Sequence, residues 1–171
     1  ERETNRLASS MGSILGCAFF YLLAPAIVSS PAVRDVFLAE PQIQLTTKLW
    51  NTVDTAIFSI GPELDAPAYS YIPREYLDLE KAAKAGGVGD VLGRIIDENG
   101  KELALPFNEH LMSIPFATLL KIPRRVGIGG GAQKCRGVLA ALRGGLVNIL
   151  VTDYETGSYI LQMEAMQRDS V

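Results

Sequence analysis

The feature that most constrains the fold is residues 124–145, RRVGIGGGAQKCRGVLAALRGG, where three local patterns follow one another. A short apolar run at 126–128 is typical of a buried strand, a glycine-rich turn follows, and residues 133–142 have a helical pattern. A turn without side chains before a helix exposes backbone N–H groups, and the helix dipole adds partial positive charge there. The segment therefore predicts a strand, a turn and a helix with an anion site at the turn.

Lys134 stands in the first turn of that predicted helix. The helix dipole disfavours a cation in this position by roughly 0.3–1 kcal/mol. A residue placed against its local preference points to a function such as ligand binding. We therefore interpret Lys134 as a ligand-binding residue, and the alternative is a lysine whose ammonium is simply solvated.

Strand-like and helix-like segments alternate along the 171 residues, apart from one hairpin. The pattern predicts helices at 3–15, 31–38, 41–51, 73–85, 116–120, 133–142 and 155–166, and strands at 18–23, 55–60, 88–96, 101–105, 126–128 and 147–151. The hairpin is predicted at 97–100, where Asn-Gly lies between apolar runs. Such alternation is typical of the α/β class, here a Rossmann-like, mainly parallel sheet with helices on both faces.

Charge and cysteine content exclude several classes of function for this chain. The net charge is −3, and the strongest basic cluster, Lys121 with Arg124 and Arg125, is too small for a nucleic-acid footprint. Cys17 and Cys135 lie far apart without metal-ligand spacing, so both are predicted to be reduced, buried thiols of a cytoplasmic protein.

A membrane association is not predicted either. The apolar stretch 12–28 is broken by Pro25 and is shorter than the ~20 residues that a membrane span needs. The polar start of the chain lacks the order of a signal peptide and begins in mid-helix pattern without a methionine. We therefore expect a fragment of a longer protein.

Three strand ends marked by glycine are candidate ligand sites, because ligands of parallel sheets bind beyond the carboxyl ends of the strands. They are residues 59–62, 86–90 and 127–134. In the second, Asp90 could accept hydrogen bonds from hydroxyl groups, and the alternative is a turn aspartate that bonds its own backbone. Asp90 and Lys134 together would suit a small, hydroxylated and anionic molecule.

A dinucleotide-binding module is an alternative interpretation of the glycine-rich turn. Gly127, Gly129 and Ala132 fit the G-x-G-x-x-A pattern, and Asp153 follows the next strand, where a ribose-binding acid would stand. Lys134 would crowd the helix that receives the pyrophosphate. A capping box of Thr152 with residue 155 would also explain the Asp153 turn without a ligand.

No catalytic or metal-binding constellation stands out in the sequence. His110 is the only histidine, and it lies in a polar step that suggests a solvated loop or the start of a helix. Glu98, Glu102 and Glu109 are predicted to be solvated charges of the hairpin and loops. We therefore predict no catalytic residues, no metal site and no cofactor.

Three stretches together resemble the effector-binding domain of SorC-type bacterial transcription regulators. They are YLLAPAIVSSPAVRDVFLAEPQI (21–43), GGVGDVLGRIIDENGKEL (86–103) and LMSIPFATLLKIPRRVGIGGGAQKCRGVLAALRGGLVNILVTDYET (111–156). The resemblance covers most of the chain in family order. It implies a fold similar to ribose-phosphate isomerases and glucosamine-phosphate deaminases.

The resemblance also implies a function, a domain organisation and a set of site residues. The family senses a phosphorylated sugar or polyol, works as a dimer or tetramer, and binds operator DNA through a helix-turn-helix. Residues 1–171 would then be an effector domain without that helix-turn-helix and without the family's first strand and phosphate loop. The implied effector contacts are Gly61, Asp90, Gly130, Gly131, Ala132 and Lys134. A sugar-phosphate isomerase or deaminase remains the enzymatic alternative, for which Asp90 would be the general base.

Overall fold

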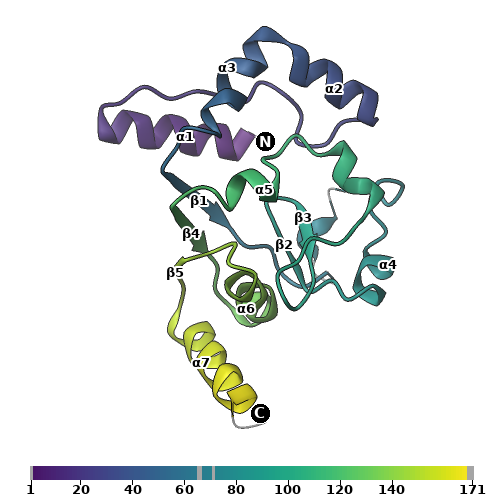
Figure 1. Ribbon diagram of the computed structural model, residues 1–171, viewed down its shortest axis with the longest axis vertical. Helices are drawn as coiled ribbons and strands as arrows, with labels where there is room; N and C mark the ends of the chain where they lie inside the picture. The colour runs from purple at the N-terminus through teal and green to yellow at the C-terminus, as the bar shows by residue number, and fades with distance from the viewer. Residues whose placement is uncertain (1, 65–66, 71, 169–171) are drawn as a thin grey trace. The chain divides into compact units, whose positions relative to one another are not determined.

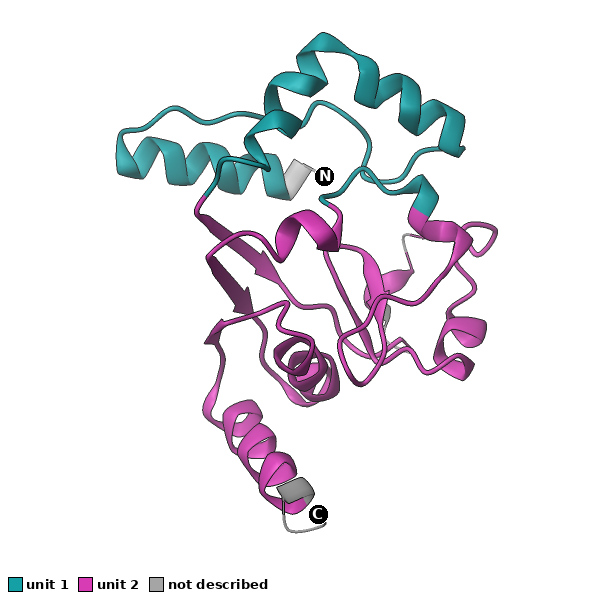
Figure 2. Ribbon diagram, in the orientation of Figure 1, with its two compact units in different colours: residues 1–53, 109–114 teal, residues 54–108, 115–171 magenta. Residues whose placement is uncertain are grey.

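The computed structural model describes residues 2–64, 67–70 and 72–168, and its chain divides into two compact units. Unit 1 comprises residues 1–53 and 109–114, and unit 2 comprises residues 54–108 and 115–171 (Figure 2). Both parts of the predicted ligand site, around Asp90 and around Lys134, belong to unit 2.

The described residues of unit 1 form the helices α1 (Arg2–Leu15), α2 (Pro31–Ala39) and α3 (Pro41–Leu49) (Figure 1). The start of α2 follows the sequence prediction. The Ser30 side chain accepts a hydrogen bond from the Val33 N–H at 3.2 Å, and Pro31 occupies the first helical position, where a missing N–H costs nothing.

The core of unit 1 joins two distant segments of the chain. Val28, Ile43 and Met112 are buried, with Val33 and Phe37 packed against them. The Val28 N–H donates to the His110 carbonyl at 2.9 Å, and the Met112 N–H donates to the carbonyl of residue 26 at 2.9 Å. His110 is partly buried rather than fully solvated, and its Nδ1 lies 2.9 Å from the Val28 carbonyl oxygen.

The predicted buried strand at 18–23 is wrong, because this segment is irregular and largely exposed. Phe20 and Leu23 are about three-fifths exposed, at 59% and 63%. The Tyr21 carbonyl accepts a hydrogen bond from the Thr46 hydroxyl at 2.8 Å rather than from a neighbouring strand. An apolar run becomes a buried strand only where a sheet edge receives its backbone groups. Cys17 is likewise exposed, contrary to prediction, whereas Cys135 is buried.

The main sheet of unit 2 has three parallel strands in the order β1 (Thr55–Ser59), β4 (Arg124–Ile128), β5 (Ile149–Val151) (Figure 1). The helices of this part of the unit are α5 (Phe116–Leu119), α6 (Cys135–Arg143) and α7 (Tyr154–Arg168). The predicted α/β class with a parallel sheet flanked by helices is therefore confirmed. The core includes the fully buried side chains Ile60, Leu119, Val138 and Leu146.

A second sheet in unit 2 is a short antiparallel hairpin of β2 (Gly89–Val91) and β3 (Arg94–Ile96). The sequence predicted one strand over 88–96, but Leu92 and Gly93 form a two-residue turn with φ of 55° and 82°. Both central residues of a type I′ turn need positive φ, and a leucine at the first of them gave no turn signal. This turn lies directly beside Asp90.

Short helical segments complete unit 2. They are the 3₁₀ helices η1 (Pro67–Tyr69), η2 (Pro106–His110), which runs on into unit 1, and η3 (Ala132–Lys134), with the α-helix α4 (Leu79–Lys84). The helix predicted over 73–85 begins only at Leu79, because the Asp78 side chain caps it by accepting the Lys81 N–H at 3.0 Å.

The predicted turn at 97–100 is present and packs on the end of α6. The Gly100 N–H donates to the Asp97 carbonyl at 2.9 Å. A Cβ at Gly100 would lie 2.7 Å from the Gly144 Cα, and Gly100 has φ of +73°. The backbone of the turn therefore touches the backbone that ends α6, with no room for a side chain.

We expect Gly100→Ala to destabilise unit 2 by more than about 2 kcal/mol, since left-handed strain of about 1–2 kcal/mol adds to a backbone overlap. Gly145→Ala is the matched control, because Gly145 has φ of +66° and open space around its Cα. Urea unfolding of both variants measures the difference. Equal losses would show that the overlap at Gly144 relaxes without cost.

Candidate functional site

Backbone hydrogen bonds bring the three predicted strand ends together in unit 2. Past the end of β1, Ile60 forms an antiparallel bridge with Val91. The Gly61 N–H then donates to the Asp90 carbonyl at 2.8 Å, and the Glu63 N–H donates to the Gln133 carbonyl at 2.8 Å. One short segment after β1 thus joins the Asp90 hairpin to the turn that carries Lys134.

Asp90 is partly buried, and both of its carboxyl oxygens have protein partners. Oδ1 lies 2.8 Å from the Tyr69 Oη, and Oδ2 accepts the Gly93 N–H at 2.9 Å. Asp90 therefore stabilises its own hairpin turn, which was the alternative that the sequence left open. Each carboxyl oxygen has two lone pairs, so this role leaves acceptor capacity for a ligand.

Gly61 touches Asp90 through the face that has no side chain. A Cβ at position 61 would overlap the Asp90 Oδ1 and would lie 2.9 Å from the Tyr69 Oη. Only glycine leaves space for the carboxyl group at the end of β1. The predicted neighbourhood of Gly61 and Asp90 is thus a direct contact.

Burial raises the pKa of Asp90 above its ordinary value. Its hydrogen bonds and the positive charge of Lys134 act in the opposite direction, but burial outweighs them. The positive charge of Lys134 thus acts on the Asp90 carboxyl group. The backbone hydrogen bonds of Gly61 and Glu63 join the segments that carry these two residues.

Lys134 ends η3 and immediately precedes α6, so it lies just outside the helix whose first turn it was predicted to occupy. Its side chain is partly buried. Among the residues that the structure describes, no carboxylate forms an ion pair with Lys134. Its ammonium is therefore available to an anionic ligand.

The exposed glycine turn before Lys134 comprises Gly130, Gly131 and Ala132. The Gly131 N–H donates to the Asp153 Oδ2 at 2.7 Å and to the Thr156 Oγ1 at 3.0 Å. The prediction that the turn amides face a ligand is therefore wrong for Gly131, because the protein itself occupies this donor. The positive charge of Lys134 becomes the main attraction for an anion at this turn.

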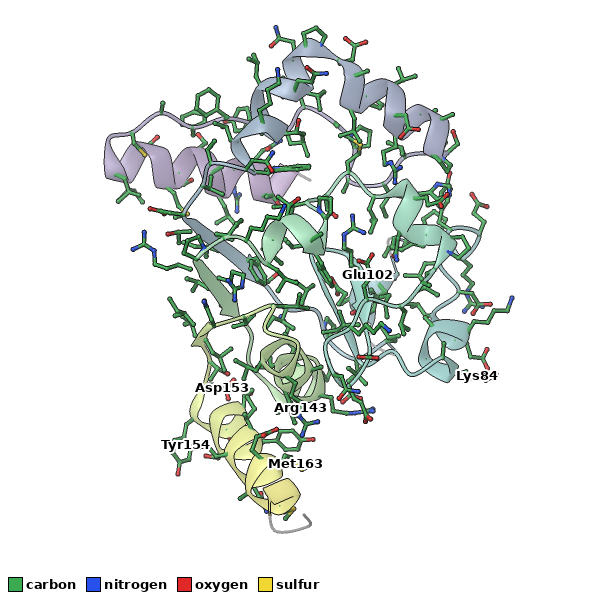
Figure 3. All side chains as sticks on the ribbon, viewed as in Figure 1. Lys84, Glu102, Arg143, Asp153, Tyr154 and Met163 are labelled. Carbon is green, nitrogen blue, oxygen red and sulfur yellow. The ribbon has the colours of Figure 1, made fainter. Side chains whose placement is uncertain are left out.

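Asp153 caps α7 and fastens the glycine turn to it. Its Oδ1 accepts the Thr156 N–H at 2.7 Å, while its Oδ2 holds the Gly131 N–H, and Figure 3 shows Asp153 at the start of this helix. The predicted capping box that begins at Thr152 is wrong by one residue, since α7 begins at Tyr154. These bonds give Asp153 a structural role and remove the argument for a ribose-binding acid.

We expect the stability that Asp153 gives to unit 2 to be lost at acidic pH. The N–H group of Thr156 lowers the pKa of Asp153 most strongly, and that of Gly131 also contributes. A lowered folded-state pKa stabilises the fold above the unfolded-state pKa, and this stabilisation is lost as the pH falls through the folded value. Melting temperatures of wild type and Asp153→Ala should therefore converge below about pH 4. A constant gap over the whole pH range would contradict this.

Tyr69 and Gly93 are site residues that the sequence reasoning missed. Tyr69 lies in η1, 21 positions before its partner Asp90, and its ring is buried. No spacing rule links a loop tyrosine to a strand aspartate at that separation. The glycine at 93 could have been found from its place in the Leu-Gly step, had that step been recognised as a turn.

Within the described residues, no group of three or more metal-ligating side chains could hold an ion. No helix in the described ranges has the length and hydropathy to cross a membrane.

Comparison with known proteins assigns this arrangement to a family. Residues 1–162 match the family model described as "Putative sugar-binding domain". The chain is 40% identical over 78 residues to the transcriptional regulator LsrR of Escherichia coli O139:H28, which covers 45% of this chain and 25% of that protein. LsrR of Enterobacter sp. strain 638 is 27% identical over 151 residues, covering 86% of this chain and 47% of the relative. The chain thus spans between a quarter and a half of these curated relatives.

Solved structures agree with the fold. A DeoR family transcriptional regulator from Listeria monocytogenes superposes with a TM-score of 0.83 at 27% identity, over 91% of this chain and 64% of the other. The full-length sorbitol operon regulator SorC from Klebsiella pneumoniae gives 0.85 at 25% identity, over 92% and 51%. These relatives are transcription regulators rather than enzymes. The chain belongs to the sugar-binding domain family of SorC-type transcription regulators.

Proposed function

We propose that this domain senses a phosphorylated sugar or polyol and thereby controls the DNA binding of a carbohydrate operon regulator. The observation that carries the proposal is that backbone hydrogen bonds join the strand ends carrying Asp90 and Lys134 in a sugar-binding domain, with the Lys134 charge acting on the Asp90 carboxyl group. The proposed effector contacts are Gly61, Asp90, Gly130, Gly131, Ala132 and Lys134.

The chemistry of the two side chains supports a ligand with two kinds of group. Asp90 has acceptor capacity for hydroxyl groups, which line a sugar or polyol. The Lys134 ammonium has no ion-pair partner among the described carboxylates, and an ammonium binds phosphate as a point charge. A phosphorylated sugar carries both groups in one small molecule.

The rest of the proposed mechanism lies outside the residues of this chain. The regulator would read operator DNA through a helix-turn-helix, as a dimer or tetramer on paired half-sites. It would act in the cytoplasm, where operator DNA is found. The net charge of −3 supports a sensing role for this part rather than a DNA-gripping role.

A thermal-shift screen of the full-length regulator tests the proposal. Sugar phosphates and the same sugars without phosphate are compared on wild type. A ligand at 100 times its dissociation constant should stabilise the protein by about 2.7 kcal/mol. Stabilisation by the phosphorylated members alone supports the proposal. Stabilisation by a nicotinamide dinucleotide, or conversion of a sugar phosphate, would replace it with one of the alternative functions.

A further inference from the structure

Three oxygen atoms form a chain at the buried end of the candidate site. The Tyr69 Oη lies 2.8 Å from the Asp90 Oδ1 on one side and 2.7 Å from the Pro62 carbonyl oxygen on the other. Both separations are typical of O–H···O hydrogen bonds. Each of the two contacts therefore needs its own proton.

The single hydroxyl proton of Tyr69 cannot serve both contacts. A phenol carries one O–H, a carbonyl oxygen carries no proton, and an ionised carboxylate is only an acceptor. If Asp90 were ionised, one of the two contacts would oppose lone pairs at hydrogen-bond distance without a proton between them. A proton on Asp90 Oδ1 resolves this: Asp90 donates to Tyr69, and Tyr69 donates to Pro62.

The geometry points to a neutral Asp90, with its proton on Oδ1 and with Tyr69 as the positioning residue that holds it. The other oxygen fits this assignment, because Oδ2 accepts the Gly93 N–H at 2.9 Å as a carbonyl oxygen would. Tyr69 is 4% exposed, so water does not compete freely for its hydroxyl.

The surroundings of Asp90 support the neutral form. The titratable groups acting on it are Tyr69, from η1, and Lys134, which precedes α6. The Lys134 ammonium favours the carboxylate, but burial favours the acid more strongly and raises the pKa of Asp90. A hydrogen bond from Tyr69 would favour the carboxylate only if Tyr69 gave its proton to Asp90, and the contact with Pro62 already uses that proton.

The charge of Asp90 affects how tightly the site binds an anion, and this step rests on the proposed function. With Asp90 neutral, the positive charge of Lys134 is not opposed by a charge on Asp90. An anion then binds without repulsion from Asp90. Ionisation of Asp90 at higher pH would place a negative charge beside the anion, so the affinity for anions should fall by up to about tenfold per pH unit above the pKa of Asp90.

The test that does not depend on any ligand is an NMR titration of the aspartate side-chain carboxyl carbons, with Asp90 assigned by its absence in Asp90→Asn. Asp90 should titrate above the ordinary aspartate range. Tyr69→Phe should lower this pKa, because the neutral acid loses the acceptor of its proton. A raised pKa in Tyr69→Phe would mean that Tyr69 donates to a carboxylate, and would overturn the inference.

A second measurement covers the case in which Tyr69→Phe does not fold. The infrared carbonyl band of a protonated carboxylic acid should be present in wild type near neutral pH and absent in Asp90→Asn. Identical spectra would overturn the inference.

The ligand consequence is measured with sulfate, which stays doubly charged over the whole range. Wild-type affinity should fall with rising pH, whereas that of Asp90→Asn should stay level. Failure of sulfate to bind at any pH would count against the proposed anion site and would leave the NMR result to decide the proton on Asp90. A wild-type affinity that rises with pH would contradict the neutral-acid account.

Discussion

Lys134→Ala is expected to weaken effector binding by about one to two orders of magnitude. A charge-assisted hydrogen bond contributes roughly 1.5–3 kcal/mol, and each 1.4 kcal/mol corresponds to about a tenfold change in affinity. The structure gives Lys134 no competing ion pair among the described carboxylates, so the loss falls on the ligand. Calorimetric titration of the effector into full-length wild type and variant measures it.

Lys84→Ala is the matched control, because it removes the same charge from α4 in the same unit. Lys84 is 75% exposed and pairs with Glu80 at 3.0 Å on the surface, an interaction that contributes little. The control should bind the effector as wild type does. Thermal unfolding of Lys134→Ala should change little, since no described ion pair is lost. Equal affinities in Lys134→Ala and wild type would make Lys134 a solvated surface residue.

Glu102→Ala is expected to destabilise the protein by up to about 3 kcal/mol, because it removes one ion-pair partner of the buried guanidinium of Arg94. The Arg94 Nη1 lies 2.7 Å from the Glu102 Oε1, and the two side chains are 10% and 28% exposed. Glu102 was predicted to be a solvated charge, and this is wrong because its side chain pairs with the buried Arg94 at the start of β3.

The control for Glu102 is Glu80→Ala, which breaks the exposed pair with Lys84 and should cost no more than about 0.5 kcal/mol. Urea unfolding provides both values. A loss below about 1 kcal/mol for Glu102→Ala would show that water or other groups compensate Arg94. Replacing both Arg94 and Glu102 with apolar residues should recover part of the stability, because the buried guanidinium is then removed together with Glu102.

The parallel core of the fold was predictable from the sequence because its signals are local. Alternating apolar runs and helix patterns placed β1, β4, α6 and α7 within a few residues of their observed bounds. The glycine-rich turn before Lys134 was also identified, since glycine and strand ends are visible in sequence. Helix caps such as Ser30 behaved as the capping rules predict.

The errors share a physical cause, which is tertiary context. Segment 18–23 has strand propensity, but the Tyr21 carbonyl bonds to a threonine hydroxyl of α3 rather than to a strand. The turn at Leu92 forms against its propensity because Asp90 holds the hairpin: its Oδ2 accepts the Gly93 N–H, and its carbonyl accepts the Gly61 N–H. Tyr69 contacts Asp90 from η1, and the spacing of these two residues in the sequence does not predict that contact.

Tertiary context also explains why the sequence predicted two residues of the site but not their hydrogen-bond partners. Asp90 and Lys134 were selected by chemical type beside glycine, and in the structure the positive charge of Lys134 acts on the Asp90 carboxyl group. The hydrogen-bond partners around the site could not be predicted, because they lie far away in sequence. The Gly131 N–H, for example, donates to the Asp153 Oδ2, 22 residues further along the chain.

The most direct test of the central claim is a crystal structure of the full-length regulator with the sugar phosphate that stabilises it best. We expect the phosphate within hydrogen-bond distance of the Lys134 ammonium, and a sugar hydroxyl on the Asp90 carboxyl group beside Gly61. A ligand bound elsewhere, with Asp90 and Lys134 unchanged and solvated, would contradict the account.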